Sequence, residues 1–169
     1  HGKSSGLDPL NSYLSLPILI NSKEDIEPAG IPSQKEGKGA VFLLDSEQVG
    51  ETEPMVNIFM NKMKNEGFRK MLNEEFVTYT DACIEDFLQG DVKSLFGNVK
   101  SLSKVVLNNF KPMIPVAFHK VWKNGINTND YYLKLCGSGG GGYILGFTED
   151  FEKAQKSLAD FKLELVYRF

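Results

Sequence analysis

The 169-residue sequence contains few of the side chains that hold metals or form disulfides. It has two cysteines and two histidines. Cys83 and Cys136 lie far apart, each within an apolar pattern, and no cysteine pair has the spacing of a zinc site or a disulfide framework. We therefore expect two buried, reduced thiols and no metal ligands of this kind in the chain.

The sequence also has no excess of positive charge and no long apolar run. Its 19 Lys and Arg are outnumbered by 22 Asp and Glu, for a net charge of −3, whereas nucleic-acid-binding domains are usually basic. No apolar stretch approaches the roughly 20 residues of a membrane helix, and no signal peptide is visible. These absences predict a cytoplasmic protein that binds neither nucleic acid nor membrane.

Glycine, in contrast, is concentrated in one place. Residues 137 to 142 hold five glycines and one serine between two apolar segments. Glycine adopts positive φ and allows backbone N–H groups to approach an anion closely. A flexible linker has a similar composition, but the flanks, residues 131–136 and 143–147, both resemble buried strands. We expect a loop shaped around phosphate or around another phosphate-binding loop.

The first eight residues, His-Gly-Lys-Ser-Ser-Gly-Leu-Asp, are dense in groups that bind anions or move protons. The sequence has no initiating Met and begins inside what looks like a functional loop. We therefore expect it to be part of a longer protein, whose upstream residues would share in any catalysis.

Apolar periodicity predicts the order of the elements. A buried strand at 40–44 is followed by helices up to Pro112, and by another helix with Gly125 as its C′ residue. Two strands flank the glycine run, Thr148 is placed to cap a short helix, and residues 163–169 form an edge strand. This order predicts an α+β, ferredoxin-like split βαβ fold with extra helices in the first crossover. Residues 8–39 are predicted to be rich in loops.

Two motifs resemble one family. Lys-Leu-Cys-Gly-Ser-Gly-Gly-Gly-Gly-Tyr, residues 134 to 143, resembles the third, C-terminal glycine-rich motif of the GHMP small-molecule kinases, whose C-terminal domain is ferredoxin-like. The opening segment resembles the His-Gly-x-x-Ser-Gly-x-Asp motif of mevalonate kinases. On this resemblance, residues 1–39 are the returning segment of an upstream N-terminal domain, and residues 40–169 are the C-terminal domain.

The resemblance implies a site and its ligands. Asp8 matches the active-site aspartate, and His1, Ser5 and Gly6 would shape the acceptor pocket. The loop would pack against the ATP-phosphate loop and support it through Gly137, Ser138, Gly139, Gly140, Gly141 and Gly142. The implied reaction uses ATP and Mg²⁺, whose ligands would lie mostly upstream. The implied partners are a small acceptor and the N-terminal domain of the same protein. Without that domain, residues 8–39 are expected to leave apolar surface exposed, which a second copy of the chain could cover in a homo-oligomer.

Several alternatives remain at this stage. Mevalonate, of the isoprenoid pathway, is the first acceptor, and phosphomevalonate or a sugar is the second. Mevalonate kinases carry a basic residue where this sequence is acidic, at 45–53, which disfavours a carboxylate acceptor. Lys134 could face phosphate or water, and Asp8 could be a turn or cap residue. A non-catalytic ferredoxin-like binding module is the alternative of another class.

Overall fold

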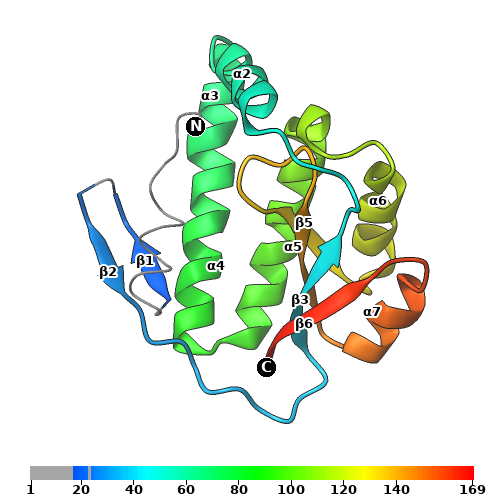
Figure 1. Ribbon diagram of the computed structural model, residues 1–169. Helices are drawn as coiled ribbons and strands as arrows, with labels where there is room; N and C mark the ends of the chain where they lie inside the picture. Colours follow the sequence, from blue (N-terminus) through cyan, green and yellow to red (C-terminus); the bar gives the residue numbers. More distant parts are fainter. Residues whose placement is uncertain (1–16, 23) are drawn as a thin grey trace.

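The computed structural model describes residues 17–22 and 24–169, and its centre is a four-stranded antiparallel sheet (Figure 1). The strand order is β4–β5–β3–β6. The first of these strands along the chain, β3, therefore lies between the third, β5, and the fourth, β6. This order confirms the predicted ferredoxin-like α+β fold. The strands are β3 (Ala40–Asp45), β4 (Tyr132–Leu135), β5 (Tyr143–Thr148) and β6 (Leu163–Arg168).

Helices fill the connection between β3 and β4. An almost continuous rod is formed by α3, η1 and α4, and η1 is a π-helical stretch within it. Side chains begin three of the helices: Asn65, Asp91 and Asp150 each accept a hydrogen bond from a backbone N–H three residues on. The helical elements are α2 (Thr52–Lys62), α3 (Glu66–Met71), η1 (Leu72–Val77), α4 (Thr78–Gln89), α5 (Val92–Asn109), the 3₁₀ turn η2 (Lys111–Met113), α6 (Phe118–Thr128) and α7 (Phe151–Ser157).

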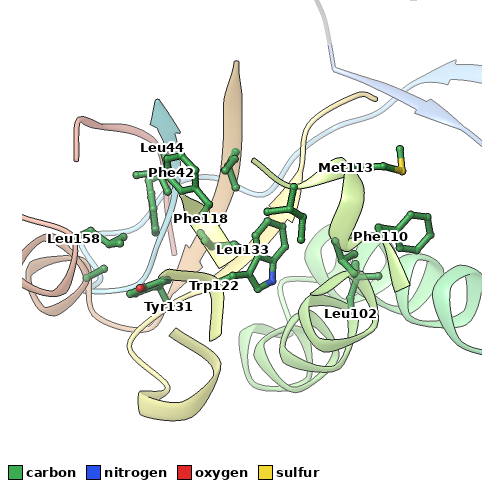
Figure 2. Packing of buried hydrophobic residues seen from close by; sticks show 14 of the residues in the cluster. Phe42, Leu44, Leu102, Phe110, Met113, Phe118, Trp122, Tyr131, Leu133 and Leu158 are labelled. Carbon is green, nitrogen blue, oxygen red and sulfur yellow. The ribbon is translucent and has the colours of Figure 1, made fainter. Parts of the chain in front are cut away.

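The main hydrophobic core joins one face of β3 to α5, α6 and α7. Trp122 is fully buried near its centre (Figure 2). Its Nε1 donates to the Ser103 hydroxyl oxygen at 2.9 Å and lies 3.1 Å from the Ser103 carbonyl oxygen. The same hydroxyl accepts from the backbone N–H of Leu133 at 3.2 Å. One serine of α5 thus ties α6 and the edge strand β4 together.

Two predicted helix boundaries were wrong. Gly125 lies inside α6, which ends at Thr128 and is followed by the cap residue Asn129, with a left-handed φ of 60°. Gly125 is needed for close packing instead, because a Cβ there would stand 2.4 Å from the Tyr131 ring. Asp150 rather than Thr148 caps α7, since the Thr148 hydroxyl is turned to the Asp130 carbonyl at 2.7 Å.

The region predicted to be loop-rich contains a small hairpin, β1 (Ile18–Ile20) paired with β2 (Ile26–Pro28). Its turn is held by the Ser22 hydroxyl, which accepts from the backbone N–H of Asp25 at 3.1 Å. The hairpin lies beside α4, on the side away from the sheet (Figure 1). Within the described residues, no helix is long and apolar enough to cross a bilayer.

Candidate functional site at the glycine loop

The glycine run forms the connection between the paired strands β4 and β5. All five of its glycines have positive φ, with values of 54° at Gly137, 76° at Gly139, 81° at Gly140, 155° at Gly141 and 71° at Gly142. Residues with a Cβ adopt these angles only with strain, which explains why this loop requires glycine at so many positions.

Backbone hydrogen bonds fasten the loop to two other segments. The N–H of Gly140 donates to the Met113 carbonyl in η2 at 2.7 Å. The N–H of Gly142 donates to the Gln48 carbonyl at 2.7 Å, and the Gly142 carbonyl accepts from the N–H of Ser46 at 3.0 Å. The loop is therefore a fixed part of the fold, held from both sides.

The loop is also packed too closely for side chains. A Cβ on Gly139 would lie 2.7 Å from the Met113 carbonyl oxygen, and one on Gly141 would lie 2.8 Å from the Gln48 carbonyl oxygen. At Gly140 it would approach the Met55 side chain of α2 to 2.9 Å. Contacts below 3.0 Å force something to move, so substitution here would displace the loop.

These contacts limit which amides can meet a ligand. Gly139 donates to the Cys136 carbonyl at 3.2 Å, so three of the six loop N–H groups already have protein acceptors. Within the described part of the chain, the N–H groups of Gly137, Ser138 and Gly141 have none. An anion at this loop would therefore be met by a smaller set of donors than the composition alone implies.

Gly137 and Ser138 border a pocket of about 450 Å³, a size suited to a small molecule. Its walls come from α2, η1, the end of α5 and η2, and three phenylalanine rings make much of the surface: Phe59, Phe76 and Phe110. Phe76 and Phe110 contact each other, with ring centroids 5.1 Å apart. The glycine loop thus lies at the rim of an apolar cavity.

Among the described residues, Lys134 is the one charged residue that lines this pocket. It projects from β4, and its Nζ donates to the Leu135 carbonyl at 3.3 Å. The structure places Lys134 at the pocket beside the loop, and a phosphate as its partner there stays a prediction. A positive charge among apolar walls favours a ligand with a negative group at this end.

Both thiols lie close to Lys134. Burial, with a smaller contribution from the Asp86 carboxylate, raises the pKa of Cys83 to about 12, although the Lys134 charge opposes the shift. Burial likewise raises the pKa of Cys136, again opposed by Lys134. Both cysteines are unpaired. They are therefore neutral thiols near pH 7 and supply no nucleophile to the pocket.

The other predicted site residues, Asp8, His1, Ser5 and Gly6, lie outside the described residues, so their roles stay predictions. Among residues 17–22 and 24–169, no group of three or more His, Cys, Asp and Glu could hold a metal ion. The Mg²⁺ that the resemblance implies thus has no ligand cluster in that part of the chain.

Sequence reasoning missed the supports of the loop. Gln48 and Met113 act through their carbonyl oxygens, and any residue type provides a carbonyl oxygen. Gly50 is a sign of this support that the sequence does carry. A Cβ added at Gly50 would lie 3.3 Å from the carbonyl carbon of Gly141, so a glycine here allows the two segments to approach closely.

Comparison with known proteins gives structural matches only. Neither a family model nor a curated protein matches the sequence. Two structures of phosphomevalonate kinase from Streptococcus pneumoniae, one in complex with phosphomevalonate and AMPPNP, match with TM-scores of 0.64 and 0.60 and 16% identity. They cover 85% of this chain and 41% and 42% of theirs.

The Lin0012 protein from Listeria innocua matches with a TM-score of 0.62 and 15% identity, over 94% of this chain and 50% of its own. This chain therefore spans half or less of the length of each of these solved structures. At such low identity the similarity establishes the fold, and the chain shares that fold with part of a phosphomevalonate kinase.

Proposed function

We propose that the complete gene product is an ATP-dependent kinase of the GHMP type, which transfers the γ-phosphate to a hydroxyl of a small acceptor. The observation that carries the proposal is the five-glycine connection between β4 and β5, fixed at the rim of a small-molecule pocket. It stands on a fold shared with part of a phosphomevalonate kinase. In this proposal, residues 40–169 are the C-terminal domain and residues 1–39 return from an upstream one.

The chemistry suits such a loop. Phosphoryl transfer needs positioning and neutralised charge more than covalent help from the protein. The N–H groups of Gly137, Ser138 and Gly141 have no protein acceptor in the described chain, and Lys134 adds a positive charge nearby. Oriented donors of this kind act on charge without reorganising during the reaction. Asp8 would orient or deprotonate the acceptor hydroxyl.

Mevalonate is the first acceptor that we propose, with phosphomevalonate or a sugar as the second. The solved complex with phosphomevalonate supports an acceptor of this chemical class. The segment 45–53 carries four carboxylates, and part of it is hydrogen-bonded to the glycine loop. This charge disfavours highly anionic acceptors unless upstream cations offset it. Kinase activity measured with acceptors of different charge therefore distinguishes mevalonate, phosphomevalonate and sugars.

The direct test measures ADP release by the complete gene product with ATP, magnesium and each acceptor. With the best acceptor as substrate, Asp8→Asn should lower kcat by at least ~100-fold with little change in the KM for ATP, as expected when a transition-state interaction is lost. If Asp8→Asn retains near wild-type kcat, Asp8 is a turn or cap residue and this mechanism is wrong.

The loop is tested by Gly140→Val, which adds a side chain where φ is 81° and Met55 is 2.9 Å from a Cβ. It should abolish turnover while the protein stays folded. Gly97→Ala is the control, because no residue that the structure describes lies within 4 Å of the added Cβ. Full activity in Gly140→Val would remove the loop from the active site.

The non-catalytic alternative predicts a different outcome. A ferredoxin-like binding module would bind its ligand without consuming ATP, whatever the acceptor.

The 169-residue chain on its own should not turn over ATP, because the ATP-phosphate motif of the family is absent from it. ADP release by this chain, stimulated by an acceptor alcohol, would contradict the division of roles proposed here.

A further inference from the structure

Charge is unevenly distributed along the chain. Between Asp91 and Asp130 lie 38 residues with six lysines, one histidine and no acidic residue. Subtracting these six charges from the overall −3 leaves −9 for the rest of the chain. The segment makes up α5, η2 and α6, so its charge gathers on two helices and the turn between them.

Part of this charge surrounds a cavity. A pocket of about 390 Å³ lies between α5, η2 and α6, and none of the described residues that line it is acidic. Each of the three elements contributes a lysine: Lys104, Lys111 and Lys123. Cationic side chains that converge from three elements on a concave surface repel one another, and a bound anion relieves that repulsion.

The pocket has a fixed wall and further polar groups. The His119 ring belongs to its lining, and the Nε2 atom of this ring lies 3.1 Å from the Lys111 carbonyl oxygen and 3.0 Å from that of Ile114. Nε2–H therefore donates to these carbonyls and fixes η2, with Lys111, against α6. Asn108 and Asn127 also line the pocket, and their amides bond to nothing in the described part of the chain.

We propose that this pocket binds a small oligophosphate anion, such as pyrophosphate, tripolyphosphate or the phosphate chain of a nucleotide. The lysines match several negative charges held close together, and the amide groups can donate hydrogen bonds to phosphate oxygens. The cavity has the volume of a small ligand. The acidic remainder of the chain opposes a long polyanion such as nucleic acid. This site is separate from the pocket at the glycine loop, with which it shares no lining residue.

The test is calorimetric titration of the 169-residue chain with inorganic tripolyphosphate at low ionic strength. Lys111→Gln/Lys123→Gln should weaken binding by at least ~10-fold, the loss expected for a charge-assisted hydrogen bond. The control is Lys93→Gln/Lys100→Gln, which removes equal charge from the same basic segment but outside the pocket. It should change the affinity by less than about twofold, and its thermal unfolding should match that of the first variant.

Titrations with ATP and with orthophosphate identify which part of a ligand the pocket recognises. ATP that binds as tightly as tripolyphosphate, with the same lysine dependence, assigns recognition to the phosphate chain alone. Orthophosphate should bind more weakly than either. The proposal is overturned if tripolyphosphate does not bind, if both double variants lose affinity equally, or if an oligonucleotide binds more tightly through the same lysines.

Discussion

One buried hydroxyl, that of Ser103, joins α5 to two other elements. It accepts from Trp122 Nε1 and from the N–H of Leu133. Trp122 also has the Ser103 carbonyl within reach at 3.1 Å, whereas the described residues offer the Leu133 N–H only the Ser103 hydroxyl. The edge strand β4 therefore depends on a side chain for one of its backbone hydrogen bonds.

Ser103→Ala should lower the free energy of unfolding by about 1–3 kcal/mol, the cost of a buried donor left without an acceptor. Urea denaturation measures this loss. Ser101→Ala is the control, because the Ser101 hydroxyl is exposed and bonds only to the Gly97 carbonyl of its own helix. Equal stability of the two variants would contradict the role assigned to Ser103.

Cys83 gives a prediction about pH. Burial raises its pKa from the ordinary 9.0 to about 12, so the folded protein keeps this proton where the unfolded chain loses it. The resulting stability is complete below about pH 9 and is lost as pH rises towards 12. Cys83→Ala should therefore lose less stability than wild type between pH 9 and pH 10.5 in denaturant titrations. An identical pH dependence would mean that Cys83 is solvated in the folded state.

At the scale of elements, two helical glycines have opposite surroundings. No described residue lies within 4 Å of a Cβ placed on Gly97 in α5, whereas a Cβ placed on Gly125 in α6 would clash with the Tyr131 ring. Both substitutions to alanine gain helix propensity, but only the second creates a clash with a buried residue.

Gly97→Ala should raise the free energy of unfolding by about 0.5–1 kcal/mol, and Gly125→Ala should lower it by about 1–3 kcal/mol. Thermal unfolding of the two variants beside wild type measures both signs. A gain in stability from both would show that Tyr131 can move aside without cost.

This pair shows what could be predicted at the level of elements. The apolar stripes of α4 and α5 have helical spacing, so the sequence alone indicates these helices. The order of helices and strands along the chain indicates the ferredoxin-like fold. The role of Gly125 depends on Tyr131, which reaches it only through the tertiary fold, so local rules mistook it for a helix end. The glycine loop was recognisable by composition, but its supports act through backbone carbonyls that have no sequence signature.

At the scale of the whole molecule, the sheet depends on its last strand. β3 pairs with β6 along most of its length, from Ala40 opposite Arg168 to Leu44 opposite Leu163. Phe169, just beyond β6, packs its ring on Phe87 and Phe96 at centroid distances of 6.2 and 5.5 Å. The strand β6 thus forms one edge of the sheet, and Phe169 packs on a second hydrophobic cluster, made of Leu95, Phe96, Val99 and Tyr132.

A chain that ends at residue 162 should therefore lose cooperative unfolding and expose the apolar strand β3 as a sheet edge. Circular dichroism should retain helix, while thermal unfolding broadens and aggregation increases. Val166→Thr is the control, since this side chain is 49% exposed, and it should unfold like wild type. A sharp transition in the shortened chain would contradict the closing role of β6.

The central place of β3 also has a consequence for synthesis. Both strands that flank β3 are made about 100 or more residues after it. At roughly 5–20 residues per second, the ribosome needs about 6–25 seconds to add residues 46–169. The pair α4 and α5 can form from local contacts during this interval. The helices of the nascent chain can therefore form before either of the strands that pair with β3 has been synthesised.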